Sequence, residues 1–407
     1  MAGALDGLRI LDLSRVLAGP WASQILADLG AEVIKVERPG TGDDTRQWGP
    51  PYLRDQEGRE TSEAAYYLSA NRGKRSLTLD LATGEGREIV RRLALQSDVL
   101  LENHKAGQLA RSGLGWEDLH PTNPRLVYCS ITGFGQTGPY ANRAGYDFVV
   151  QALGGLMSVT GEADARPGGG PQKVGVAVAD IMAGLYACVA ILAALAARAT
   201  TGQGQHIDLA LLDVGVATLA NVALNYLVSG SIPRRWGNAH PNIAPYQVVP
   251  TADRPIVLAI GNDAQFRAFC VAAGEAPLGD DPRYTTNAAR VRHREALTAE
   301  VERLLAARPA ADWVAALETA GVPAAPINDL AETFADPQVR HRGLAVRAPH
   351  PLADTVPLVA SPLRLSATPV GPATAPPLLG QHTDEILRER LGMHAETIAD
   401  LRQRGII

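Results

Sequence analysis

The sequence predicts an α/β fold built on a parallel sheet, together with a second, smaller α+β domain. Short apolar runs alternate with amphipathic helical segments through the first half of the chain. This alternation is typical of a parallel sheet whose two faces are covered by helices. Near Ser229 the composition shifts toward Pro and Gly, as in a linker between domains. A length of 407 residues is enough for two or three domains.

The strands of the large domain are predicted from apolar runs bounded by turn residues. They are expected at Leu8–Ser14, Glu32–Glu37, Ser76–Leu81, Val99–Asn103 and Leu126–Thr132. Helices are expected at Trp21–Leu29 and Glu85–Leu95. Parallel sheets bind ligands beyond the carboxyl ends of their strands, at a switch in strand order. The loops after Leu13, Glu37 and Glu102 are therefore the expected place for a site.

The second half of the chain is predicted to form a smaller domain followed by a tail. Tyr246–Ile260 has the pattern of two short strands, and Asp263–Gly274 that of a helix. The tail carries short apolar runs at Leu344–Val346 and Leu363–Leu365 and a final helix near Thr383–Leu391. We therefore divide the chain into residues 1–225, 226–334 and 335–407.

Composition excludes several classes of function. The 38 Lys+Arg and 43 Asp+Glu residues give a formal net charge of −5, so no nucleic-acid partner is expected. The hydrophobic fraction of 46% argues against disorder. Cys129, Cys188 and Cys270 suit neither a disulfide framework nor a metal site, which is typical of a cytoplasmic protein.

No targeting segment or membrane span is expected. The first strand-like run begins at Leu8, which leaves no room for a signal peptide. The longest apolar run, Ile181–Ala197, is shorter than the ~18–20 residues that cross a bilayer, so it is expected to be a buried helix and no membrane partner is predicted.

Three common catalytic motifs are absent or incomplete. Gly133–Gly138 (GFGQTG) matches a dinucleotide-binding pattern, but Pro139 follows it and no acidic residue stands about 20 positions on, so a plain loop is expected. The nine histidines lack metal-ligand spacing, and no metal is expected. Ser229 lacks the pattern of a nucleophile elbow.

Three polar residues are of interest, and two of them, Asp180 and Arg38, have both a structural and a functional interpretation. Asp180 precedes the long apolar run and could be a helix N-cap, or a carboxylate that the helix dipole keeps ionised for nucleophilic attack. Tyr146 has the pattern of a half-buried aromatic residue with a paired hydroxyl. Arg38, at the end of a strand, is either a solvated loop charge or a phosphate ligand.

Beyond single motifs, the chain resembles the class III CoA-transferases, also called the CaiB/BaiF family. The resemblance runs nearly from end to end and keeps the order of the family's blocks. The matching blocks are Leu11–Arg46, Asn71–Leu81, Leu100–Gly107, Ile131–Asp147, Lys173–Asp180, Thr201–Asp213 and Pro376–Leu387.

The resemblance implies a fold, a substrate and a set of site residues. It implies a Rossmann-like large domain completed by the returning tail, and a homodimer of two interlocked rings. It also implies acyl-CoA as a substrate, with no permanently bound cofactor, and Asp180 as the nucleophile. The positions that it places near CoA are Val16, Ala18, Arg38, Leu79, Asn103, His104, Arg111 and Tyr146.

Position 146 separates two activities within this superfamily. The related α-methylacyl-CoA racemases have a histidine there as an acid/base partner of the aspartate. Tyrosine, with a pKa near ~10, is a poor base at neutral pH, so Tyr146 favours a transferase over a racemase or acyl-CoA isomerase. A non-catalytic CoA-binding protein is a further alternative, but it would not need Asp180.

The choice of acids is predicted from two further segments. Leu17 and Gly237–Tyr246 depart from the residues that formyl-CoA:oxalate transferases carry at these places, and the chain looks closer to succinyl-CoA:glutarate transferases. A dicarboxylic acceptor would need a cation for its distal carboxylate, and Arg46 and Arg143 are the candidates.

Overall fold

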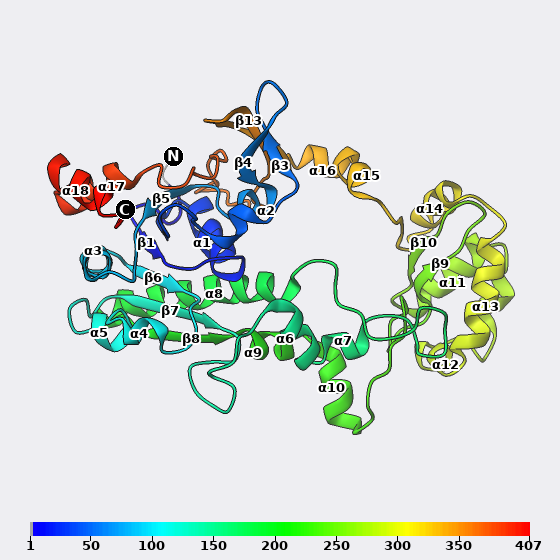
Figure 1. The fold of residues 1–407 in the computed structure, drawn as a ribbon. Helices are drawn as coiled ribbons and strands as arrows, with labels where there is room; N and C mark the ends of the chain where they lie inside the picture. The colour runs from blue at the N-terminus through cyan, green and yellow to red at the C-terminus, as the bar shows by residue number, and fades with distance from the viewer. Residues whose placement is uncertain (1–2) are drawn as a thin grey trace. The chain divides into compact units, whose positions relative to one another are not determined.

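The computed structural model describes residues 3–407, which form two compact units (Figure 1). The first unit comprises the residues up to 156 together with 174–223 and 337–407. The second unit comprises residues 157–173 and 224–336. Residues 157–173, which the sequence places within the first 225 residues, thus belong to the second unit.

The first unit contains a six-stranded parallel sheet, which confirms the predicted α/β fold. The strands are β1 (Arg9–Asp12), β2 (Glu32–Glu37), β5 (Lys74–Thr78), β6 (Val99–Glu102), β7 (Val127–Thr132) and β8 (His206–Ala210). Their order is β5-β2-β1-β6-β7-β8, and every neighbouring pair is parallel. The strand order reverses between β1 and β6. The loops after β1, β2 and β6 therefore meet at the carboxyl edge of the sheet, where a ligand is expected.

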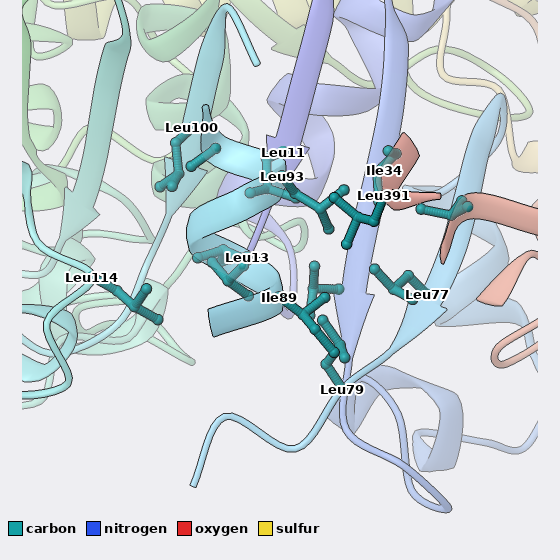
Figure 2. Packing of buried hydrophobic residues seen from close by; sticks show 14 of the residues in the cluster. Leu11, Leu13, Ile34, Leu77, Leu79, Ile89, Leu93, Leu100, Leu114 and Leu391 are labelled. Atoms are coloured by element: carbon teal, nitrogen blue, oxygen red, sulfur yellow. The ribbon is translucent and has the colours of Figure 1, made fainter. Parts of the chain in front are cut away.

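Helices cover both faces of this sheet because successive strand residues point in opposite directions. Ile10 of β1 packs with α1 (Ala18–Asp28) and α8 (Val178–Thr201), whereas Leu11 faces α3 (Gly84–Ala94) and α17 (Thr383–Leu391). Figure 2 shows leucine and isoleucine side chains of β1, β2, β5, α3 and the C-terminal segment meeting in this second layer. The sheet is thus buried on both faces, as its apolar strands require.

The remaining elements of the first unit are short. The hairpin strands are β3 (Tyr52–Arg54) and β4 (Glu60–Ala64), and a 3-10 helix, η1, spans Asp44–Gln47. The short helices are α2 (Ala65–Ser69), α4 (Gln108–Arg111), α5 (Trp116–Leu119), α6 (Asp147–Leu153), α7 (Leu156–Val159), α9 (Leu211–Ala217), α10 (Ala220–Ser229), α16 (Pro337–His341) and α18 (Ala395–Gln403). Helices α7 and α10 each continue from the first unit into the second.

The C-terminal segment packs against the first half of the chain. The N–H of Asp80 donates to the carbonyl of Ile406 at 2.8 Å, and Arg75 forms ion pairs with Glu385 and Glu389 of α17. The last core layer is therefore supplied by the last residues of the chain.

The tail also holds an antiparallel hairpin of β12 (Ala345–His350) and β13 (Ala353–Val359). The predicted strand at Leu363–Leu365 is wrong, since no strand is assigned there, and the second strand lies earlier. β13 is difficult to predict because it contains Pro357. Proline normally argues against a strand, but it is tolerated in an edge strand, and both strands of a two-stranded sheet are edge strands.

The second unit is an α+β structure with its own core. Its antiparallel sheet, in the order β11-β10-β9, consists of β9 (Tyr246–Val249), β10 (Ile256–Ala259) and β11 (Ala324–Pro326). Its helices are α11 (Asp263–Ala272), α12 (Asn287–Arg292), α13 (Arg294–Leu305), α14 (Ala310–Thr319) and α15 (Leu330–Ala335), with a 3-10 helix, η2, at Ala276–Asp280. Phe266, Phe269 and Trp313 are fully buried at its centre.

Helix α8 alone among single helices of residues 3–407 is long and apolar enough to cross a membrane; α9 and α10 pass that test only as a bent pair. One face of α8 packs against α1 and β7 in the core of the first unit. Such length and composition are also found in core helices of proteins that do not cross membranes.

Candidate functional site

The loop after β1, residues 14–17, is fixed through its main chain by side chains from neighbouring strands. Asn103, just after β6, accepts a hydrogen bond from the N–H of Arg15 at 2.9 Å and donates one to the carbonyl of Arg15 at 2.6 Å. Asp12 accepts from the N–H of Ser14 at 2.9 Å and from its hydroxyl. We call residues 14–17 the first loop.

Val16 of the first loop has a backbone conformation that β-branched residues rarely adopt. Its φ is +69°, and its N–H donates to the carboxylate of Asp43 at 3.2 Å. Asp43 forms a fully buried ion pair with Lys35 at 2.9 Å, and Lys35 also donates to the carbonyl of Ser14. Strained backbone of this kind persists only where surrounding contacts enforce it, and it concentrates at ligand sites.

Four buried charged residues, Asp12, Lys35, Asp43 and Lys74, form what we call the loop clamp. Lys74 lies 3.4 Å from Asp12 and donates to Asn71 and to the carbonyl of Pro20 at 2.9 Å. Burial alone would raise the pKa of Asp43, but Lys35 and hydrogen bonds from Thr45 lower it to about 2. Lys35 and Asp43 therefore hold the first loop as an ionised pair, whereas burial lowers the pKa of Lys74 to about 7.

Asp180 lies in the first turn of α8 but does not cap that helix. The N-cap residue is Ala177, and the hydrogen-bond acceptor is Asp147, whose Oδ1 accepts from the N–H groups of Ala179 at 2.8 Å and Asp180 at 3.3 Å. The structural interpretation of Asp180 as an N-cap is thus wrong, because a residue from α6 performs this task. The carboxylate of Asp180 is left free of that role.

The surroundings of Asp180 are poor in positive charge. No salt bridge joins Asp180 or Asp147 to a cation within residues 3–407. Burial, with a smaller effect from the Asp147 carboxylate, raises the pKa of Asp180 to about 7. An acid with a pKa near neutrality is a candidate for chemistry rather than for structural pairing.

Two close backbone approaches place these groups at the carboxyl edge of the sheet. A Cβ on Gly133, just after β7, would lie 2.5 Å from the Cα of Gly145, so the start of α6 passes directly over the end of β7. Gly184, one turn after Asp180 on α8, approaches α1 so closely that a Cβ would lie 2.7 Å from the carbonyl oxygen of Ala18. Asp180 thus lies one turn before the point where α8 meets Ala18, the first residue of α1, which directly follows the first loop.

Tyr66 of α2 is a member of this site that the sequence did not indicate. Its pKa is raised by burial and then by Asp180, Asp147 and Asp43, so its hydroxyl lies within electrostatic reach of all three carboxylates. Its ring meets the half-exposed Trp48 edge to face at 5.1 Å. Tyr66 stands in no recognisable motif, and only the fold brings it near Asp180.

The positions for which the resemblance implies CoA contact lie around the carboxyl edge, with different exposures. Arg38 and Arg111 are exposed cations, and Arg38 pairs with Asp44 at 2.6 Å. Ala18 and Leu79 are buried, and the side chain of Leu79 is part of the core, so it has only its main chain to offer a ligand. Tyr146 is 65% exposed, so the prediction of a half-buried aromatic residue is wrong.

Asn103 and His104 are occupied mainly by the protein itself. Asn103 holds the first loop as described. The N–H of His104 donates to Glu102 at 2.7 Å, and burial followed by Arg15 lowers the pKa of His104 to about 4. A neutral imidazole is therefore expected at this position.

The two arginines expected to bind an acceptor differ sharply. Arg46 is buried, pairs with Glu37 at 2.8 Å and with Glu63 at 3.4 Å, and stacks over the ring of Tyr67. Its guanidinium is committed to these partners within the protein and is not available to an acceptor carboxylate. Arg143 is exposed and lies over the Tyr140 ring.

Within residues 3–407, no cluster of three or more His, Cys, Asp or Glu side chains could hold a metal ion.

Comparisons with known proteins agree over nearly the whole chain. Residues 5–383 match the family described as CoA-transferase family III. The chain is 52% identical to a succinate–glutarate CoA-transferase of Agrobacterium fabrum over 95% of both chains. It is 44% identical to a succinyl-CoA:glutarate CoA-transferase of Mus musculus, covering 99% of this chain and 90% of the relative. Its fold matches a CaiB/BaiF family protein from Brucella suis, with a TM-score of 0.83, 50% identity, and coverage of 96% of this chain and 100% of the other.

Proposed function

The chain belongs to CoA-transferase family III and is a CoA-transferase, and we propose that it moves CoA from succinyl-CoA to a C4–C5 dicarboxylic acid such as glutarate. The observation that carries the proposal is the carboxylate of Asp180 in the first turn of α8. It pairs with no cation within residues 3–407, and it lies one turn before the close contact of α8 with α1. The relatives named above, which act on succinate or succinyl-CoA and glutarate, support the choice of acids.

We assign to Asp180 the role of nucleophile in a double exchange. Its carboxylate attacks the carbonyl carbon of the donor thioester, and the C–S bond breaks to release CoA thiolate and leave an acyl–aspartyl anhydride. The thiolate then attacks the aspartyl carbonyl, which forms an aspartyl-CoA thioester and releases the donor acid. The acceptor carboxylate repeats both steps in reverse, so that the bond energy is kept in covalent form throughout.

Three features of the site support this chemistry. Half-burial strips part of the hydration from Asp180, which makes the ionised carboxylate more reactive. The dipole of α8 favours negative charge near its amino end, and Asp180 lies in the first turn of that helix. Each tetrahedral oxyanion requires N–H donors, and main-chain groups of the glycine-containing loops are the candidates.

CoA would be bound at the carboxyl edge of the sheet. We assign the exposed guanidinium groups of Arg38 and Arg111 to the CoA phosphates, since arginine pairs well with phosphate oxygens. The main chain at Val16 and Ala18 would contact CoA, with Asn103 holding the first loop and His104 next to Asn103 in the chain. Tyr146 would lie beside the thioester, and Arg143 is the remaining candidate for the distal carboxylate of the acceptor.

We further propose that the protein acts as an interlocked homodimer. Helix α8 exposes a stripe formed by Leu185, Tyr186, Val189 and Leu192, whose exposed fractions range from 36% to 64%. Apolar stripes of this extent favour burial against a partner chain. Size-exclusion chromatography with light scattering would test this state, and a monomer at micromolar concentration would contradict it. The free, buried state of all three cysteines supports a cytoplasmic location.

The deciding experiment is covalent trapping on the intact protein. The enzyme is incubated with succinyl-CoA, treated with hydroxylamine or borohydride, and its mass is measured beside that of Asp180→Ala. A labile adduct on the wild type only, discharged by glutarate, is the expected result. An adduct that glutarate leaves intact would overturn the choice of acceptor. No adduct with any of several acyl-CoA donors would overturn the transferase mechanism and favour α-proton exchange.

A further inference from the structure

A second aspartate, Asp147 of α6, is connected to the start of α8 by hydrogen bonds. Its two carboxylate oxygens accept hydrogen bonds from different groups. Oδ1 accepts from the main chain at the start of α8, as described above, while Oδ2 accepts from the side-chain amide of Gln151 at 2.6 Å. Both oxygens are therefore engaged, although no cation pairs with Asp147 within residues 3–407.

Gln151 extends this connection to the segment before α8. Its side chain is 1% exposed, and its Oε1 accepts from the N–H of Val174 at 2.9 Å. The chain of contacts thus runs from the Val174 main chain through Gln151 and Asp147 to the main chain of Ala179 and Asp180. It holds the approach to α8 at two points, one on each side of the turn that leads into the helix.

We infer that Asp147, braced by Gln151, is the positioning residue that sets the place of the Asp180 nucleophile. The inference rests on the proposed function, because it assumes that Asp180 is the nucleophile. Helix α8 has no side-chain cap of its own, so Asp147 is the group that satisfies its first free N–H donors. A carboxylate supplied from α6 leaves the side chain of Asp180 unoccupied and still fixes the backbone that carries it.

A neighbouring negative charge makes this arrangement unlike an ordinary cap. Asparagine or serine would accept the same hydrogen bonds without repelling an ionised Asp180. With aspartate, a like charge stands beside the nucleophile, which favours the states in which Asp180 carries no charge. The acyl–aspartyl anhydride and the aspartyl-CoA thioester are such states, so the charge of Asp147 would favour the covalent intermediates over the free carboxylate.

The electrostatic effect on Asp180 can be assigned to Asp147, because the other elements packed against α8 place no charged group that shifts the pKa of Asp180. Helix α1 has no titratable residue before Asp28. The remaining titratable groups on packed elements, which do not shift the pKa of Asp180, are Tyr128 and Cys129 of β7, His206 and Asp208 of β8, and Asp213 of α9. Tyr66 of α2 also faces Asp180 but is neutral at pH 7, since its pKa is raised.

The test separates the geometry of Asp147 from its charge. Asp147→Ala removes both, and we expect the rate of adduct formation on Asp180 to fall by about 10²-fold, as for a reacting group displaced by about 1 Å, with KM for the acyl-CoA unchanged. Asp147→Asn alone keeps the Oδ1 acceptor but presents an N–H₂ group to the amide of Gln151. We expect it to give an intermediate rate.

A double variant restores every hydrogen bond. In Asp147→Asn/Gln151→Glu, the asparagine would accept from Ala179 and donate to the new carboxylate, whose second oxygen would accept from Val174. We expect its adduct rate to exceed that of Asp147→Asn and to approach that of the wild type. Its pH profile should be displaced to lower pH, because the negative charge then lies one helical turn farther from Asp180.

Asp329→Ala is the matched control for a purely structural role. Asp329 caps α15 in the second unit and accepts from the N–H of Glu332 at 2.8 Å. It should lower the melting temperature about as much as Asp147→Ala, with an unchanged adduct rate. The inference is overturned if Asp147→Ala forms the adduct at the wild-type rate, if Asp329→Ala slows it equally, or if the double variant is no faster than Asp147→Asn. A wild type that forms no adduct would instead overturn the proposed function itself.

Discussion

Two acidic groups lie at the same edge of the sheet and have opposite electrostatic surroundings. In the loop clamp, Asp43 is buried beside Lys35, and its pKa is lowered to about 2. At the start of α8, Asp180 has another carboxylate as its charged neighbour, and its pKa is raised to about 7. Tyr66 lies within electrostatic reach of both.

The difference shows how one sheet edge can serve two purposes. Where charges of opposite sign are paired, they fix a strained loop, and breaking a pair would cost stability. Where a carboxylate lacks a cation, little stability depends on it, and it is available for reaction. Removing Asp180 should therefore cost activity without stability, and removing a member of the loop clamp should cost stability first.

The largest expected effect is the loss of activity in Asp180→Ala. Removal of a covalent nucleophile reduces kcat by on the order of 10⁴–10⁶-fold. Because Asp180 is not paired with a cation, the melting temperature should be unchanged or slightly higher. Steady-state transfer assays would measure kcat, and thermal unfolding would measure the melting temperature. A variant that loses activity because it unfolds would contradict the contrast drawn between Asp180 and the loop clamp.

The next effect is on stability, in Lys35→Met. This change leaves Asp43 buried without its cation and should cost about 3–5 kcal/mol of unfolding free energy, measured by urea denaturation. Lys35→Met/Asp43→Asn should lose less, because no charge is left unpaired. Arg404→Met, which breaks the exposed pair with Glu85, is the control and should cost less than about 1 kcal/mol.

Acid should remove the contribution of Asp43 in a defined window. Its folded-state pKa lies below the ordinary 3.8, so its stabilisation is present above that value and is lost as the pH falls toward about 2. A shift of this size corresponds to about 2.4 kcal/mol. The difference in unfolding free energy between the wild type and Asp43→Asn should shrink by this amount over the same range of pH. A difference that stays constant would show that pairing does not lower the pKa of Asp43.

The smallest effect is on the pH profile of the reaction. The ionised form of Asp180 attacks, so kcat/KM should rise with pH up to about 7 and level off above it, with about a tenfold loss for each pH unit below. Asp147→Asn should move the rising part of the kcat/KM profile to lower pH, because it removes the negative charge beside Asp180. A profile that is flat from about pH 5 to pH 9 would show that Asp180 does not have its raised pKa in the working enzyme.

Much of the sheet could be predicted from the sequence because its strands are continuous apolar runs. The exceptions have physical causes. β5 begins at Lys74, two residues before the predicted run, because this lysine is buried with hydrogen-bond partners that no pattern reveals. β8 was not predicted, since it is a short edge strand with alternating exposure and carries His206 and Asp208.

The site could be predicted only where its residues lie in motifs. Asp180 stands in such a block, but the residue that caps its helix is Asp147, which lies 33 positions earlier. Arg46 has the charge expected of an acceptor ligand, yet its pairing with Glu37 and Glu63 depends on strands that only the fold brings together. Tyr66 reaches Asp180 for the same reason.

The order in which the ribosome makes the chain has a consequence for the covered edge of the sheet. Strand β5 is the outermost strand on its side, and its partners in α17 follow it by 310 residues in the case of Arg75 and Glu385. At about 5–20 residues per second, the interval between them is about 15–60 s. During this time the edge of β5 lacks the hydrogen bonds that the C-terminal segment later makes to Ser76 and Thr78. An uncovered edge strand invites pairing with another chain, so newly made protein should be most prone to aggregation before its last helices emerge.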